Sequence, residues 1–243
     1  MTIGHFVWTD LSTYDMQAAR SDYAAFFGWA FQGDADYDFA TQHGYEVAAV
    51  FPMPARLADM NMPSFWMSYV HVENVDRTVE RARTHEGAVI EVEPQPFDET
   101  ARIALVRDPS GAGFTVYEGP DITPLSGGHG AVQQRYHHVD DAERVRDFYA
   151  DLFGWSLDRA SDKPWPTFDV KHPDGLIVAR LEEAPENVRG KFKYWMPCFE
   201  VDALNAFGQR VTAAGGEILT DLPENRKMFA DRQGAHFMAR ATV

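Results

Sequence analysis

One stretch of sequence occurs twice in this chain, and the repetition constrains the fold more than any other feature. Residues 23–29 read Tyr-Ala-Ala-Phe-Phe-Gly-Trp, and residues 149–155, 126 positions further on, read Tyr-Ala-Asp-Leu-Phe-Gly-Trp. Two shorter echoes follow in the same order: Trp66-Met67 with Trp195-Met196, and residues 111–114 with 234–237. Echoes that keep their order over half the chain indicate a duplicated domain rather than a solenoid of short repeats.

The duplication predicts two domains joined by an exposed connection. The chain has 243 residues, so each half is long enough to bury a core of its own. Residues 119–130 are dense in Gly, Pro and Ser, a composition typical of a linker. We therefore expect a first domain over residues 1–120, a linker over 121–131 and a second domain over 132–243.

The composition excludes several classes of partner. The formal net charge is −15, whereas nucleic acids and anionic membranes require a basic surface. The single cysteine, Cys198, allows no disulfide within the chain, which suits a reducing compartment. The N-terminus lacks a basic region followed by an apolar stretch, and no apolar run is long enough to span a bilayer. We expect a cytoplasmic protein with neither nucleic acid nor membrane as a partner.

Helices and strands are predicted in the same order in both halves. Residues 15–27 have the apolar spacing of a helix that begins at the N-cap Asp15 and ends before Gly28. Further helices are predicted over 76–85, 141–153 and 203–214. The strands of the first half are predicted over 3–11, 37–51 (two strands), 65–72, 89–93, 101–107 and 114–118. Those of the second half are predicted near 132–139, within 166–182, over 194–201 and after residue 214 to 243. Strand, helix and three strands, twice per half, predict an α+β fold with curved mixed sheets around a cavity.

The order of elements resembles the vicinal oxygen chelate superfamily, which includes glyoxalase I, the bleomycin-resistance proteins and the extradiol dioxygenases. The residues that carry the resemblance are Asp15, Tyr23-x4-Gly28-Trp29, Trp66-x2-Tyr69-x2-Val72 and Asp108-Pro109-x-Gly111, followed by Asp141, Phe148-Tyr149-x4-Gly154-Trp155, Trp195 and Asp231-x2-Gly234. It covers nearly the whole chain apart from the linker. The resemblance implies two tandem glyoxalase-like domains, each a pair of βαβββ modules.

The resemblance also implies where a metal would bind. Members of this superfamily hold a divalent metal with His, Glu or Gln on the first and last strands of each half-domain. The corresponding positions here are Trp8, Met67, Thr115, Gln134, Met196 and Met238. Indole, thioether and hydroxyl side chains are not the donors such metals prefer. We therefore predict no cofactor; a divalent metal held by a different set of residues is the alternative.

An apolar pocket is predicted in the first domain. Trp8, Tyr69 and Tyr117 lie on strands and would line a concave surface, with Asp10 as its polar anchor; filling the core is the alternative role. Buried among aromatic rings, Asp10 would have a raised pKa and could act as a general base, or it caps a turn with Thr13. The predicted ligand-binding residues are Trp8, Asp10, Met67, Tyr69, Thr115, Tyr117, Gln134, Met196 and Met238.

Two functions are predicted, and a third stays open. By analogy with the bleomycin-resistance proteins, the chain binds a small, partly apolar molecule without metal. Alternatively, it is a lyase, isomerase or dioxygenase that uses an unusual metal set or Asp10 as base. Thirdly, it is an interaction protein with filled pockets. The adjacent His137 and His138 point to opposite faces of a strand and are expected to be structural. One chain supplies both domains, so we expect a monomer or a homodimer.

Overall fold

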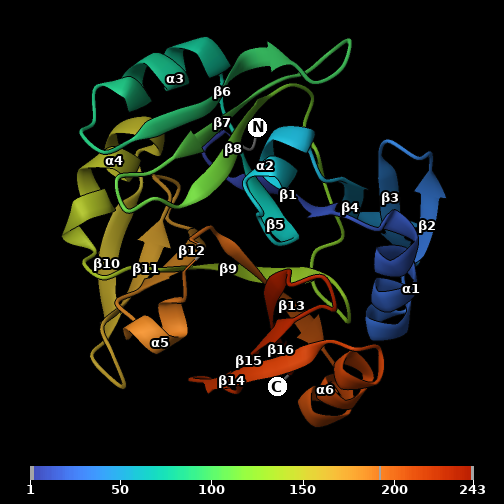
Figure 1. Ribbon diagram of the computed structural model, residues 1–243. Coiled ribbons are helices and arrows are strands. Elements are labelled where there is room, and N and C mark those ends of the chain that lie inside the picture. Colours follow the sequence, from blue (N-terminus) through green and yellow to red (C-terminus); the bar gives the residue numbers. More distant parts are fainter. Residues whose placement is uncertain (1–2, 192, 242–243) are drawn as a thin grey trace. The chain divides into compact units, whose positions relative to one another are not determined.

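The computed structural model describes residues 3–191 and 193–241 (Figure 1). In this part of the chain, strands and helices form an α+β fold with two open eight-stranded sheets. The strands of the first sheet are β1 (Phe6–Thr13), β2 (Ala30–Gly33), β3 (Asp38–Gln42), β4 (Tyr45–Pro52), β5 (Phe65–His71), β6 (Val89–Pro96), β7 (Arg102–Arg107) and β8 (Gly113–Glu118). Their order is β2-β3-β4-β1-β5-β8-β7-β6.

The second sheet repeats this arrangement. Its strands are β9 (Val132–His138), β10 (Ser156–Ser161), β11 (Thr167–Lys171), β12 (Ile177–Glu182), β13 (Met196–Val201), β14 (Glu217–Leu222), β15 (Arg226–Ala230) and β16 (His236–Ala241). Their order is β10-β11-β12-β9-β13-β16-β15-β14. Both sheets contain parallel and antiparallel pairs, for example β1 with β4 and β3 with β4. The predicted fold class is thereby confirmed.

The four predicted helices are present, with slightly different ends. They are α1 (Met16–Phe27), α3 (Val75–Arg83), α4 (Glu143–Phe153) and α6 (Leu204–Ala213). Two short helices, α2 (Ala55–Asp59) and α5 (Glu186–Arg189), and strands β2 and β10 were not predicted, because each is too short to show a clear apolar period. Among the described residues, no helix combines the length and the apolarity that crossing a bilayer requires.

The repeated helix–Gly–Trp sequence is a helix end. Asp15 caps α1 by accepting a hydrogen bond from the Ala18 backbone N–H at 2.9 Å. Gly28 and Gly154 end α1 and α4 in the left-handed conformation, with φ of 76° and 70°. Glycine adopts this conformation without the strain that a Cβ atom brings.

Contacts divide the chain into two compact units, and each unit draws on both sequence repeats. Unit 1 comprises Met1–Val7, Ser68–Ile122 and Gln134–Trp195; unit 2 comprises Trp8–Met67, Thr123–Gln133 and Met196–Val243. Unit 1 therefore joins the second half of the first repeat to the first half of the second. Unit 2 joins the two outer halves of the repeats. The predicted boundaries at residues 120 and 132 describe the sequence repeat and stay a prediction.

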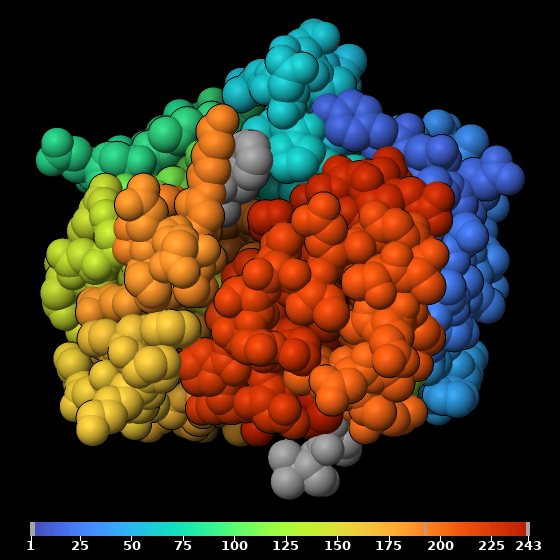
Figure 2. All heavy atoms as spheres, turned by 60° about the horizontal axis from the view of Figure 1, so that its bottom comes forward, coloured from blue at the N-terminus to red at the C-terminus, as the bar shows by residue number. Residues whose placement is uncertain are grey.

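Both units have a helix pair against an apolar core. In unit 1, α3 contacts α4 and strands β6 to β8 (Figure 1), around buried side chains that include Val79, Phe114 and Phe148. In unit 2, α1 contacts α6, and the rings of Phe27 and Phe199 lie 4.9 Å apart. Figure 2 shows the side of unit 2 where α6 and β14–β16 reach the surface, as the orange-to-red region. The apolar faces that the sequence pattern predicts are the ones that are buried.

A hydrogen-bonded chain of three residues lies buried in unit 1. The Trp195 indole N–H donates to the Tyr149 hydroxyl at 2.8 Å, and this hydroxyl donates to Asp108 Oδ2 at 2.8 Å. Asp108 Oδ1 accepts the backbone N–H groups of Ser110 and Ala112 and so closes the turn before β8. One carboxylate thus ties a turn of the first repeat to a helix and a strand of the second.

Unit 2 contains the same arrangement with the repeats exchanged. The Trp66 indole donates to the Tyr23 hydroxyl at 3.0 Å, and Tyr23 donates to Asp231 Oδ2 at 3.1 Å. Asp231 Oδ1 accepts backbone N–H groups from Gln233 and Ala235. The tyrosines, tryptophans and turns that recur in the sequence are therefore the polar centres of the two units.

The two centres differ in charge. In unit 1, burial by itself would raise the pKa of Asp108, but the charge of His137 and its hydrogen bond at 2.8 Å hold that pKa below its ordinary value. The position of unit 2 that corresponds to His137, 126 residues earlier, is Leu11. Burial there raises the pKa of Asp231. Burial also raises the pKa of Tyr23 and Tyr149, and the neighbouring carboxylate adds to the shift.

Candidate functional site

In unit 2, the sheet face opposite α1 carries a buried carboxylate among aromatic rings. Asp10 pairs with Ala49 of β4, and Ala49 pairs with Phe39 of β3, so these three residues share a face. On the other face, Arg20 of α1 forms an ion pair with Asp38. Since α1 covers that other face, Asp10 points away from the helix.

Trp8, Tyr37 and Asp10 form a hydrogen-bonded chain on this face, in addition to the chain of Trp66, Tyr23 and Asp231. The Trp8 indole N–H donates to the Tyr37 hydroxyl at 2.9 Å, and Tyr37 donates to Asp10 Oδ2 at 3.1 Å. Trp8 and Asp10 are 4% and 0% exposed. Burial and the Asp10 charge raise the pKa of Tyr37, so its hydroxyl stays a donor. Asp10 lies within β1, a strand that extends to Thr13.

Aromatic rings surround this chain. The ring of Tyr37 lies 5.1 Å from that of Phe39 and 6.2 Å from that of Phe51, and Trp8 lies 6.2 Å from Phe39. Rings at such distances pack against one another, and Tyr37, Phe39 and Phe51 stay partly exposed, so part of each ring is open to a planar molecule. A carboxylate beside them can accept a hydrogen bond from a hydroxyl or amine group, as Asp10 does from Tyr37.

The corresponding face of unit 1 is charged instead. Here β9 pairs Tyr136 with Arg180 and His138 with Glu182. His138 Nε2 lies 3.1 Å from Glu182 Oε2, and the Trp165 indole donates to the same oxygen at 3.4 Å. By register, Glu182 occupies the place of Phe51. Of these two faces, the one in the first repeat is therefore the predominantly aromatic one.

An ion pair completes the charged face. Arg180 Nε lies 3.1 Å from Asp169 Oδ1, and the two residues pair across β11 and β12. By register, Arg180 and Asp169 occupy the places of Ala49 and Phe39. His137 and His138, expected on opposite faces, enter separate networks, with Asp108 and Glu182 respectively.

The positions of the family's metal ligands carry unsuitable donors. The Trp8 indole nitrogen is a hydrogen-bond donor, and Gln134 accepts the backbone N–H of Arg135 at 2.9 Å. Met238 Sδ accepts a hydrogen bond from the buried Arg226 at 3.5 Å, which places a cation beside this position. Thr115, Met67 and Met196 add a hydroxyl and two thioethers. This donor set does not fit a hard or borderline divalent metal.

The structure distributes the nine predicted ligand-binding residues over both units. Unit 2 contains Trp8, Asp10, Met67, Met196 and Met238; unit 1 contains Tyr69, Thr115, Tyr117 and Gln134. Trp8 and Asp10 are joined through Tyr37, and Tyr69 lies beside Thr115 by register.

One predicted residue, Tyr117, is engaged elsewhere, and one residue of the aromatic face, Tyr37, was not predicted. The Tyr117 hydroxyl donates to the Pro120 carbonyl at 3.0 Å, and burial raises its pKa. Tyr37 was not predicted as a site residue, although its position two residues before Phe39 in the strand pattern indicates the same face.

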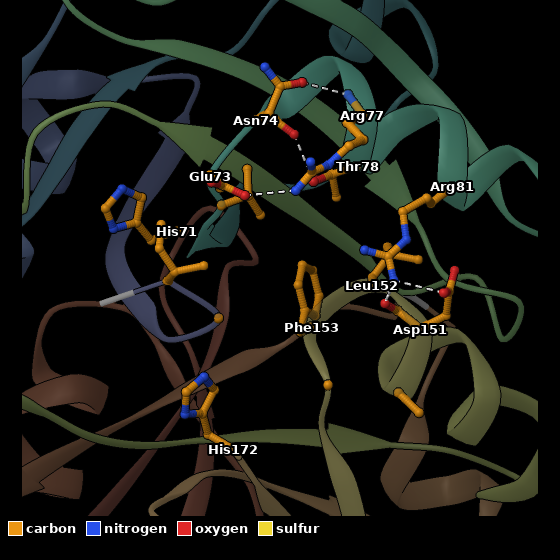
Figure 3. Close-up of a pocket in the computed structure, with 15 residues that line it drawn as sticks. His71, Glu73, Asn74, Arg77, Thr78, Arg81, Asp151, Leu152, Phe153 and His172 are labelled. Atoms are coloured by element: carbon orange, nitrogen blue, oxygen red, sulfur yellow. Dashed lines mark hydrogen bonds and ion pairs between the residues drawn. The ribbon is translucent and has the colours of Figure 1, made fainter. Parts of the chain in front are cut away.

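A separate cavity of about 380 Å³ opens in unit 1 between the start of α3 and the end of α4 (Figure 3). Its arginines are paired with carboxylates, Arg77 with Glu73 and Arg81 with Asp151, each at 2.7 Å. The lining residues are Ile3, Gly4, 71–74, Arg77, Thr78, Arg81, 150–154 and His172. None of the nine predicted residues is among them, so this polar cavity is distinct from the aromatic face.

Comparisons with known proteins agree with the fold. The model of the Glyoxalase/Bleomycin resistance protein/Dioxygenase superfamily matches residues 2–116 and 137–238. The protein CFP32 of Mycobacterium tuberculosis, which carries a glyoxylase name, is 27% identical over 95% of this chain and 92% of its own length. The anthracycline biosynthesis protein DnrV of Streptomyces peucetius is 27% identical over 95% of this chain and 90% of its own length.

Solved structures show the same fold at low identity. The Mn(II)-bound glyoxalase from Novosphingobium aromaticivorans has a TM-score of 0.62 and 11% identity, over 100% of this chain and 88% of the other. A homoprotocatechuate 2,3-dioxygenase from Brevibacterium fuscum has a TM-score of 0.62 and 13% identity, over 97% of this chain and 70% of the other. At such identities the likeness extends to the fold alone.

Proposed function

Because the chain belongs to the glyoxalase/bleomycin resistance protein/dioxygenase superfamily, we propose that it binds a small, planar, partly apolar molecule on the sheet face of Trp8, Tyr37 and Asp10. The observation that carries the proposal is the chain of hydrogen bonds from indole to phenol to buried carboxylate. It places a polar anchor among stacking surfaces, which is the composition of a small-molecule site.

The proposed binding does not use a metal. The donor set at the family's ligand positions does not suit one, since Trp8 donates a hydrogen bond and Met238 contacts a guanidinium group. Sequestration by ring stacking and a hydrogen bond to Asp10 needs no metal-bound oxygen. The protein is then a binding protein of the bleomycin-resistance kind rather than a glyoxalase or dioxygenase.

The proposed ligand class is a hydroxylated aromatic molecule with fused rings. Rings of Trp8, Phe39 and Phe51 favour a flat apolar surface, and Asp10 favours a hydroxyl donor. The similarity to DnrV supports this class, since its name places it in the biosynthesis of anthracyclines, which are fused-ring aromatic molecules with hydroxyl groups.

A titration with 1,8-dihydroxyanthraquinone, followed by quenching of tryptophan fluorescence, tests this function. We expect saturable binding by the full chain, weakened about tenfold or more in Asp10→Asn and in Trp8→Ala, because a charge-assisted hydrogen bond or a stacking surface is lost. Asp169→Asn, at the position of the second repeat that corresponds by register to Phe39, is the matched control and should bind as the unmodified chain does. Equal binding in all variants, or none in the unmodified chain, contradicts the proposal.

One observation favours an enzyme as the second candidate. His138 and Glu182 form a buried imidazole–carboxylate pair on the charged face of unit 1, with side chains 5% and 2% exposed. A carboxylate that orients an imidazole is a common general base. Such an enzyme would be a lyase or isomerase that moves a proton, and His138→Gln would abolish its turnover. A screen with the hemithioacetal of methylglyoxal and glutathione, with and without Mn²⁺, decides between turnover and binding.

A further inference from the structure

Two histidines and an aspartate meet at the surface of unit 1, away from both sheet faces. His5 Nε2 lies 2.8 Å from Asp174 Oδ2, and His172 Nδ1 lies 3.0 Å from the same oxygen. The three ligand atoms all lie within 4.8 Å of one another. The side chains of His5, His172 and Asp174 are 21%, 17% and 41% exposed, so an ion from solvent can reach them.

The backbone holds His5 in place. The Gly4 N–H donates to the His71 carbonyl at 2.7 Å, and the His71 N–H donates to the His5 carbonyl at 2.9 Å. The Trp155 indole donates to the Gly4 carbonyl at 2.7 Å. A Cβ atom at Gly4 would lie 2.8 Å from His172 Nε2, so the glycine permits the close approach of the two segments.

A tight turn holds the other two side chains. The turn His172-Pro173-Asp174-Gly175 connects β11 to β12 and is closed by the hydrogen bond from Gly175 N–H to the His172 carbonyl at 2.9 Å. Asp174 Oδ1 accepts the Leu176 N–H at 2.9 Å, which leaves Oδ2 directed at the histidines. That backbone hydrogen bond and the neighbouring imidazoles lower the pKa of Asp174 to about 2, so the carboxylate is ionised.

We propose that His5, His172 and Asp174 form a binding site for a divalent transition-metal ion, Zn²⁺ foremost. Two imidazoles with one carboxylate are a donor set that Zn²⁺, Ni²⁺ and Cu²⁺ accept, with water in the remaining position. Donors about 2.1 Å from a tetrahedral Zn²⁺ lie about 3.4 Å apart. The observed separations of 2.8 and 3.0 Å need to widen by only a few tenths of an ångström.

The ion replaces existing contacts at these atoms. It takes the place of the contacts between Asp174 Oδ2 and the two imidazoles, and of the weak hydrogen bond from the Asp174 N–H to His172 Nδ1 at 3.2 Å. His5 directly precedes β1, whereas the family's metal positions lie within the strands, so the proposed site is a different one. The ion would join the segment before β1 to the β11–β12 turn, at a wall of the cavity in Figure 3 that includes Gly4 and His172.

Calorimetric titration of the full chain without an affinity tag with ZnCl₂ tests this site. We expect one equivalent of Zn²⁺ to bind, with affinity lowered at least about tenfold in His5→Gln, His172→Gln and Asp174→Asn. His85→Gln is the matched control, because His85 also contacts a carboxylate, Asp151 at 3.1 Å, but has no second histidine. Circular dichroism checks that each variant is folded.

Two outcomes would overturn the site. The first is that the unmodified chain binds no stoichiometric Zn²⁺. The second is that His5→Gln and His172→Gln bind Zn²⁺ as tightly as the unmodified chain does. The test is independent of the ligand proposed for the aromatic face.

Discussion

At the scale of single residues, the two buried aspartates show how one motif acquires two electrostatic roles. Asp108 accepts hydrogen bonds from Tyr149 and from the imidazole of His137. Asp231 accepts one from Tyr23, and the position equivalent to His137 is Leu11. One carboxylate is thus paired with an imidazole, and the other is held by hydroxyl and backbone N–H donors.

This difference predicts unequal costs for the same substitution. Asp108→Asn leaves the buried His137 without its carboxylate and should lower the free energy of unfolding by about 3–5 kcal/mol at pH 7. Asp231→Asn keeps an oxygen for the Gln233 and Ala235 N–H groups and should cost about 1 kcal/mol or less. Urea unfolding of the two variants measures both values. Equal costs would contradict the assigned roles.

The directions of the two pKa shifts predict opposite dependences on pH. The pKa of Asp108 is lowered in the folded chain, so its stabilisation is complete above the ordinary value of 3.8 and is lost as the pH falls through the folded pKa. The pKa of Asp231 is raised, so its protonated form stabilises the fold at low pH, and this contribution is lost as the pH rises from 3.8 through the folded pKa. Relative to the unmodified chain, Asp231→Asn should therefore gain stability as the pH rises, and Asp108→Asn should lose it.

At the scale of elements, the helix ends are equivalent in sequence but not in their surroundings. Gly28 and Gly154 both follow their helix with a positive φ. A Cβ atom at Gly28 would meet nothing within 4 Å, whereas one at Gly154 would lie 2.9 Å from Pro173 Cγ. The turn that carries His172 and Asp174 thus packs directly against the end of α4.

The two glycines form a matched pair for mutation. Gly28→Ala should cost about 1–2 kcal/mol, the strain of a left-handed alanine. Gly154→Ala should cost more than Gly28→Ala, because the methyl group also displaces Pro173. Thermal unfolding of both variants, in one buffer, gives the comparison. A smaller loss of stability in Gly154→Ala than in Gly28→Ala would show that the turn of residues 172–175 moves aside at no cost in free energy.

The sequence predicted the helices and strands better than the tertiary contacts between them. The helix ends at Gly28 and Gly154 follow from local rules, since capping and φ depend on neighbouring residues. The role of Tyr37 could not be read from the chain, because its contacts Trp8 and Asp10 lie 29 and 27 residues away. The sequence repeat also does not predict which half-domains pack together, since both copies present equivalent apolar faces.

At the scale of the whole molecule, the compact units cross the boundary between the repeats. Each unit takes its buried Asp from one repeat and the matching Tyr and Trp from the other. A fragment of residues 1–120 therefore contains Tyr23 and Trp66 without Asp231, and Asp108 without Tyr149.

The isolated first repeat should consequently fail to fold as a stable monomer. We expect the fragment 1–120 to bind the dye ANS, or to dimerise, and to lack the cooperative unfolding transition of the full chain. Mixing it with fragment 121–243 should restore the transition. A folded monomeric fragment 1–120 would show that the sequence repeat is an independent domain after all. Analytical ultracentrifugation and thermal unfolding distinguish these outcomes.

The crossed carboxylates have a consequence for inheritance. Replacing the Asp of one copy removes a hydrogen bond from the Tyr of the other, so a change in either gene segment alters the packing of both copies. Selection therefore acts on the two copies together at these positions, whereas the sheet faces that carry Asp10 and Glu182 are aromatic in one copy and charged in the other.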